Sequence, residues 1–131
     1  MIVVDTSVWV DYFNGVPTRQ ATALDRLLGE RPIAVGDLVL AELLQGLSTE
    51  ADANTVVEFL EPFDFVAMGG RELALASAAN YRRLRRRGVT IRKTIDMLIG
   101  TYCVLGGHEL LHSDRDFDLL EKHLGLRTVR A

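Results

Sequence analysis

The strongest constraint on the fold is an alternation of short apolar runs with longer amphipathic segments. Runs such as Ile2-Val3-Val4 and Ile33-Ala34-Val35 are rich in β-branched residues, which is typical of buried strands. Further strands are expected at 63–66, 110–112 and 126–129. Between the strands, apolar residues recur at helical spacing and predict helices at about 6–13, 19–28, 38–47, 49–60, 71–87, 95–105 and 115–123. This alternation predicts an α/β fold with a central, mostly parallel sheet of about five short strands.

Composition limits the class of protein. The 131 residues suit one domain, residues 1–131, and 48% of them are hydrophobic while 25% are charged, as in ordinary globular proteins. No apolar stretch approaches the roughly 18 residues that span a membrane, and the first residues show no signal-peptide pattern. The single cysteine, Cys103, excludes an internal disulfide and fits a reducing compartment. We therefore expect a cytoplasmic protein with no membrane partner.

Acidic residues occupy positions at which an α/β fold can bring them together. Asp5 ends the first strand, and Asp114 follows the strand at 110–112. Glu42 lies within an apolar helix, and Asp96 lies in the first turn of another. Asp116 follows Asp114 by two residues. If the strands before Asp5 and Asp114 are neighbours, their carboxylates converge in one crevice at the carboxyl edge of the sheet.

Each of these residues also has a purely structural interpretation. Asp114 can cap a helix, and Asp96 can complement a helix dipole. Glu42 can be a half-exposed helical residue, and Asp116 can be a dipole partner in an exposed first turn. Asp5 is the hardest to explain in this way, because a carboxylate at the end of a buried strand is costly unless something pairs with it.

A shared divalent cation would explain the whole set. Several carboxylates within a few ångströms repel one another and raise one another's pKa. An all-oxygen site of this kind suits Mg²⁺, with Mn²⁺ as the alternative, whereas no His/Cys cluster has zinc-ligand spacing. A cation held there can activate water and stabilise the charge that develops on a phosphoryl group during hydrolysis.

Four motifs in this order resemble a known family. The run Val3-Val4-Asp5-Thr6-Ser7-Val8-Trp9 resembles the opening of PIN-domain nucleases, in particular the VapC-type toxins of bacterial toxin–antitoxin pairs. Three later stretches resemble the family's second, third and fourth acidic motifs. They are residues 40–46 (LAELLQG), 94–99 (TIDMLI) and 112–117 (HSDRDF). Each motif is weak by itself, but the ordered set covers essentially the whole chain.

The resemblance implies a three-layer α/β/α PIN fold and a toxic, magnesium-dependent endoribonuclease. Such an enzyme would cleave structured RNA, either tRNA or rRNA, and so inhibit translation. The positions that match the family's catalytic and metal-binding acids are Asp5, Glu42, Asp96 and Asp114. Thr6 matches the hydroxyl that supports the first of these acids, and Asp116 matches an extra metal-binding carboxylate that the family uses variably. A homodimer and a VapB-type antitoxin are the implied protein partners.

Basic residues gather before the third acidic motif. Thirteen of the fifteen cationic residues are arginine, and five of them lie at 82, 83, 85, 86 and 87, followed by Arg92 and Lys93. The cluster can be a solvated helix end with cations favoured by the helix dipole, or it can contact an RNA backbone. Arg92 and Lys93 are the better RNA-binding candidates, because they lie close to Asp96 in the sequence.

Three other functions remain as alternatives. One is a PIN-fold RNA-processing nuclease that belongs to no toxin–antitoxin pair. A second is a metal-dependent phosphatase, although Ser7 stands where a dehalogenase-type enzyme needs a second aspartate. The third is a binding module without catalysis, which the loss of an acidic residue would have favoured.

Overall fold

The computed structural model describes all 131 residues and contains one five-stranded parallel sheet. Its strand order is β3-β2-β1-β4-β5, and every pair of neighbours is parallel. The strands are β1 (Ile2–Val4), β2 (Ile33–Gly36), β3 (Asp64–Val66), β4 (Glu109–Leu111) and β5 (Arg127–Thr128). The prediction of a central parallel sheet with five short strands is confirmed.

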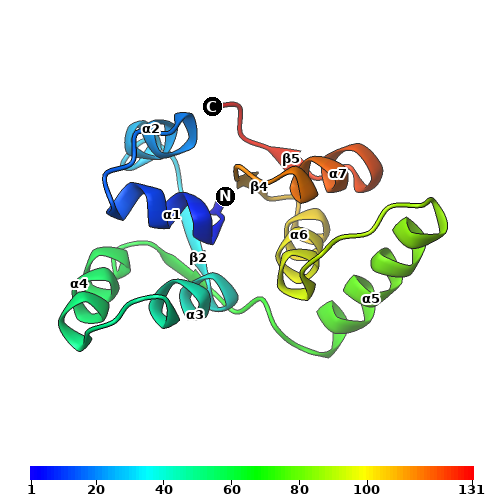
Figure 1. Cartoon of the computed structure of the whole chain (residues 1–131), viewed down its shortest axis with the longest axis horizontal. Helices are drawn as coiled ribbons and strands as arrows, with labels where there is room; N and C mark the ends of the chain where they lie inside the picture. Colours follow the sequence, from blue (N-terminus) through cyan, green and yellow to red (C-terminus); the bar gives the residue numbers. More distant parts are fainter.

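Seven helices complete the fold. They are α1 (Thr6–Phe13), α2 (Arg19–Leu27), α3 (Asp37–Gln45), α4 (Glu50–Leu60), α5 (Arg71–Arg86), α6 (Thr94–Gly106) and α7 (Arg115–Leu124). In Figure 1, α1, α2 and α4 lie on one side of the strands and α6 and α7 on the other, with α5 packed outside α6. This arrangement is the expected three-layer α/β/α architecture. None of the helices combines the length and the apolarity that crossing a membrane requires.

The centre of the sheet is fully apolar, as the sequence pattern predicts. All three residues of β1 have no exposed surface, because β2 and β4 cover both of its edges and helices cover both of its faces. Trp9 of α1 is also fully buried, and its ring stacks on Phe13 with the centroids 5.7 Å apart. The first helix is therefore anchored next to the end of β1, which fixes the position of Asp5.

The order in which strands are added to the sheet reverses on the two sides of β1. The connections β1–β2 and β2–β3 step toward one edge, and the chain then crosses back to place β4 on the other side of β1. Parallel sheets bind ligands at the carboxyl ends of their strands at such a switch point. The Asp5 amide donates a hydrogen bond to the Leu111 carbonyl over 2.9 Å, so the two strand ends lie side by side.

Two helices begin directly after a residue whose side chain forms no cap hydrogen bond. The cap of α1 is Asp5, and Thr6 is already the first helical residue. The cap of α6 is Lys93, and Thr94 is already the first helical residue. In both cases the residue before the hydroxyl has the extended backbone of a cap, and no cap side chain accepts a hydrogen bond from the helix. The Thr6 and Ser7 hydroxyls are consequently free to contact acidic side chains.

Candidate active site

Asp5 is held rigidly at the end of β1. It is only 7% exposed, and its Oδ2 accepts a hydrogen bond from the Ser7 hydroxyl over 2.8 Å. Burial raises the pKa of Asp5, the Ser7 hydrogen bond lowers it, and the nearby charge of Glu42 raises it further. Burial and the charge of Glu42 therefore both disfavour the ionised form of the Asp5 carboxyl.

Glu42 reaches the same site from α3. Its Oε1 accepts a 2.7 Å hydrogen bond from the hydroxyl of Thr6, the residue next to Asp5. The resemblance implies that the Thr6 hydroxyl supports Asp5, but this hydroxyl bonds to Glu42, and the Ser7 hydroxyl bonds to Asp5. Ser7 was missed in the sequence, although a hydroxyl two residues after an aspartate commonly bonds to its side chain.

Asp96 is the most perturbed of the acidic residues. It is 6% exposed and receives no hydrogen bond from any other group of the protein. Burial raises the pKa of Asp96 to about 6, and the negative charge of Asp5 contributes next. Asp114 and Glu42 raise this pKa further, whereas the charge of Lys93 lowers it. The four predicted acids are therefore close enough to interact electrostatically around Asp96.

Asp114 and Asp116 are tied to Arg92. The Arg92 guanidinium lies 3.5 Å from Asp114 Oδ1 and 3.2 Å from Asp116 Oδ2, and the Arg92 amide also donates to Asp116 over 3.2 Å. Asp114 in addition caps α7, because its Oδ1 accepts from the Asp116 amide. The structural interpretation of Asp114 is therefore correct, and it coexists with the electrostatic coupling to Asp96.

His112 helps to position Asp114. Its Nδ1 accepts a 3.2 Å hydrogen bond from the Asp114 amide, and burial lowers the pKa of this imidazole. A ring that accepts at Nδ1 in its neutral form carries its proton at Nε2. This neutral His112 orients the loop after β4, a role that no spacing in the sequence indicates.

A polar cleft opens beside these residues. It has a volume of about 720 Å³, and its walls include Ser7, Arg92, Asp114 and Arg115. Both predicted RNA-binding cations, Arg92 and Lys93, are exposed near the acids, as their place in the sequence suggested.

The donor chemistry of the site fits a hard divalent cation. Carboxylate oxygens are the ligands that Mg²⁺ and Mn²⁺ prefer, and a cation would relieve the repulsion that raises the pKa of Asp96. The side chains are not preassembled, since no three His, Cys, Asp or Glu side chains are grouped closely enough to hold an ion. An ion would thus have to draw the carboxylates together.

Comparison with known proteins assigns the family. A family model described as the PIN domain matches residues 2–122, which is most of the chain. The chain belongs to the PIN-domain family. It is 30% identical over 131 residues to ribonuclease VapC11 of Mycobacterium tuberculosis and to a VapC ribonuclease of Mycobacterium bovis, and each match covers 98% of both chains.

Solved structures share the PIN fold of this chain. A VapBC2 complex from Rickettsia felis bound to a promoter DNA fragment matches with a TM-score of 0.77 at 19% identity, over 98% of each chain. VapC20 of Mycobacterium tuberculosis, a toxin that cleaves the sarcin–ricin loop, matches with a TM-score of 0.67 at 18% identity, over the full length of both chains. At these identities the likeness concerns the fold.

Proposed function

We propose that this PIN-domain protein, one domain over residues 1–131, is a toxic endoribonuclease that cleaves structured RNA, tRNA or rRNA, and thereby inhibits translation. The observation that carries the proposal is that the strand ends before Asp5 and Asp114 lie side by side at the switch point of the sheet, where Thr6 also holds Glu42. Asp96 lies close enough for these acids to raise its pKa. The ribonuclease names of the 30%-identical relatives support it. The proposed catalytic residues are therefore Asp5, Glu42, Asp96 and Asp114.

In this proposal the four acids hold Mg²⁺ or Mn²⁺, which supplies Lewis-acid activation of water and neutralises charge on the phosphoryl group. Thr6 and Ser7 orient Glu42 and Asp5 through the hydrogen bonds described above. The role of Asp116 as a ligand stays a prediction, since its Oδ2 is engaged by Arg92.

Arg92 and Lys93 supply the local positive charge that an acidic protein needs to approach RNA. The whole chain has a formal net charge of −3, so its long-range field does not attract a polyanion. Arg92 lies at the mouth of the polar cleft with its side chain 70% exposed, and it can contact a phosphate while it remains near Asp114.

A VapB-type antitoxin is the proposed inhibitor of this cytoplasmic enzyme, and a homodimer is its proposed assembly. Several structural neighbours are complexes of VapC-type proteins with their antitoxins, which supports the partner assignment. The neighbour named a sarcin–ricin loop-cleaving toxin supports rRNA as one class of target.

The test is cleavage of purified tRNA and ribosomal RNA by the antitoxin-free protein. With Mg²⁺, the native protein should produce discrete fragments, and both Asp5→Asn and Asp96→Asn should reduce cleavage to background while the proteins stay folded. Asp64→Asn is the matched control, because Asp64 is exposed at the opposite, amino end of the edge strand β3. Cleavage by the two site variants at the native rate would refute the proposal.

A further inference from the structure

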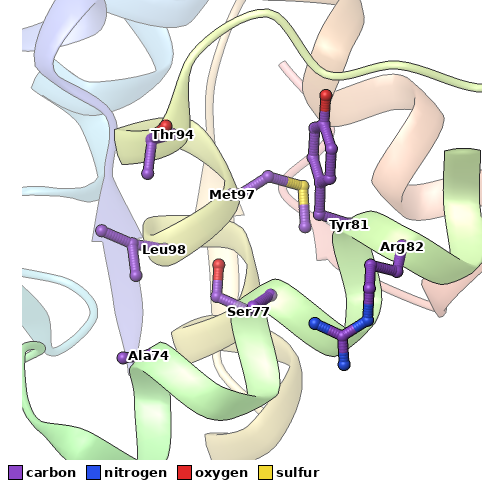
Figure 2. A pocket seen from close by; sticks show the side chains of 8 residues that line it. Ala74, Ser77, Tyr81, Arg82, Thr94, Met97 and Leu98 are labelled. Carbon is purple, nitrogen blue, oxygen red and sulfur yellow. The ribbon is translucent and has the colours of Figure 1, made fainter.

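A second cavity lies between α5 and α6, outside the acidic site. This α5–α6 groove has a volume of about 510 Å³, and Figure 2 shows how the two helices line it. Its walls are mainly apolar and come from Ala74, Ser77, Ala78 and Tyr81 of α5 and from Met97 and Leu98 of α6. Its volume is in the range of sites that hold small aromatic ligands.

One polar side chain lies in the wall of the groove. Ser77 is 4% exposed, and its hydroxyl forms no hydrogen bond within the protein. The hydroxyl is nevertheless open to the groove, because Trp9 Nε1 is the only fully buried polar side-chain atom without a partner. Figure 2 shows this hydroxyl directed into the space between the helices. The groove therefore offers a ligand one hydroxyl that can both donate and accept a hydrogen bond.

The exposed end of the groove is basic and aromatic. Residues 74, 77, 78, 81, 82 and 85 form one stripe along α5, since side chains three and four residues apart share a helix face. The stripe therefore runs from the apolar groove to Arg82 and Arg85, and the Arg85 guanidinium lies 5.6 Å from the centre of the Tyr81 ring. Neither arginine forms an ion pair with a carboxylate.

We propose that the α5–α6 groove binds an unpaired nucleobase of the RNA substrate, while Arg82 and Arg85 bind the adjacent phosphates. Unpaired bases are recognised by stacking on aromatic rings or guanidinium planes together with hydrogen bonds to their edges. Tyr81, Arg82 and the Ser77 hydroxyl supply these groups. This inference rests on the proposed ribonuclease function and adds a specificity subsite to it.

The place of the groove relative to the acids suits a continuous RNA strand. Thr94 and Met97 line the groove in the same first turn of α6 that carries Asp96. At 3.6 residues per turn, Asp96 faces the opposite side of the helix. A strand that crosses the amino end of α6, next to the exposed Arg92 and Lys93, would therefore pass from the acidic site to the groove within a few nucleotides.

Charge favours RNA over a second copy of the chain as the occupant. In a two-fold symmetric contact the same surface patch lies on both subunits, so the basic end of α5 would approach its own copy. The five arginines at 82–87 would then repel one another, whereas an RNA backbone neutralises them. Protein docking is the outcome that the experiment has to distinguish.

The experiment uses Ala78→Phe to fill the groove and Ala79→Phe as its matched control. Ala78 lines the groove, whereas Ala79 is exposed on a different face of α5. Binding of fluorescently labelled hairpin RNAs with an unpaired loop is measured by anisotropy in EDTA, where cleavage is blocked. We expect Ala78→Phe to weaken binding at least about fivefold, as loss of one stacked base does, and Ala79→Phe to bind as the native protein does.

The role of Arg82 and Arg85 is tested separately, by the salt dependence of RNA binding. Loss of two single-strand phosphate contacts should reduce the slope of log K against log salt by about 1.4 in the double variant of Arg82→Gln and Arg85→Gln. The matched double variant of Arg83→Gln and Arg87→Gln should keep the native slope, because neither residue is three or four positions from a member of the stripe.

Two results would overturn the subsite. One is native RNA affinity in Ala78→Phe, and the other is a change of oligomeric state in that variant, measured by sedimentation velocity, without a loss of RNA binding. Cleavage by the native protein in Mg²⁺ is measured in parallel. If the native protein cleaves RNA and Ala78→Phe binds RNA normally, the groove subsite is refuted and the ribonuclease function stands. If Ala78→Phe weakens RNA binding but the native protein cleaves no RNA, the ribonuclease function is refuted and the groove stands as an RNA-binding site.

Discussion

Replacement of Asp96 by asparagine should stabilise the metal-free protein at neutral pH. Burial and the charges of three neighbouring acids make the ionised form of Asp96 unfavourable in the folded protein. Asparagine removes this charge and keeps the size of the side chain. The native state binds the Asp96 proton more tightly than the unfolded chain does, so the stabilisation from this group is complete below pH 3.8 and is lost as the pH rises through about 6. Asparagine has no proton to lose and avoids this penalty.

The magnitude follows from the shift in pKa. A rise from 3.8 to about 6 corresponds to roughly 3 kcal/mol above pH 6, at 1.36 kcal/mol per unit. The effective dielectric around a charged group in a protein is well above that of a dry interior, so the expected gain is reduced to about 1.5 kcal/mol. For a domain of this size that gain corresponds to about 5 °C in Tm.

The assay is urea unfolding in EDTA between pH 4 and pH 8. The difference in unfolding free energy between Asp96→Asn and the native protein should be close to zero at pH 4 and reach its full value by pH 7.5. Asp64→Asn, at an exposed position, should show no such pH dependence. A variant that is less stable than the native protein at pH 7.5, with no gain relative to pH 4, would refute the electrostatic description of the site.

Three further variants probe other parts of the structure. Thr6→Val loses the 2.7 Å hydrogen bond to Glu42, and single-turnover kinetics should show cleavage about tenfold slower, as loss of about 1.4 kcal/mol implies. Gly100→Ala places a methyl group against the buried Leu120 side chain, so the urea midpoint should fall by the equivalent of about 1–3 kcal/mol. Arg92→Gln should change stability by less than about 1 kcal/mol, because the side chain is 70% exposed, but filter binding should show weaker and less salt-dependent RNA association.

The arrangement of the strands follows from the sequence because it depends on local pattern and on general rules of topology. Three apolar residues before Asp5 can hardly be anything other than a buried strand, and alternating helices require parallel pairing. The neighbouring position of β1 and β4 was only a condition in the sequence-based argument, and the structure fulfils it.

The hydrogen-bonding partners within the site did not follow from the sequence. Thr6 and Ser7 are adjacent and chemically similar, so the sequence cannot indicate which hydroxyl reaches Asp5 and which reaches Glu42. The contact of Arg92 with Asp116 joins residues 24 positions apart across a loop and depends on how α7 packs. The α5–α6 groove was missed because small residues on a helix face normally indicate close packing, whereas here they leave a cavity.

The most direct test of the central claim is a titration of the native protein with Mn²⁺, followed by electron paramagnetic resonance. If the acids of the sheet edge form one divalent-cation site, the signal of free Mn²⁺ should be depleted saturably. The double variant of Asp5→Asn and Asp96→Asn should abolish this depletion, while Asp64→Asn should leave it unchanged. Binding of Mn²⁺ that is equal in the native protein and the double variant, or no binding by the native protein at all, would contradict the account.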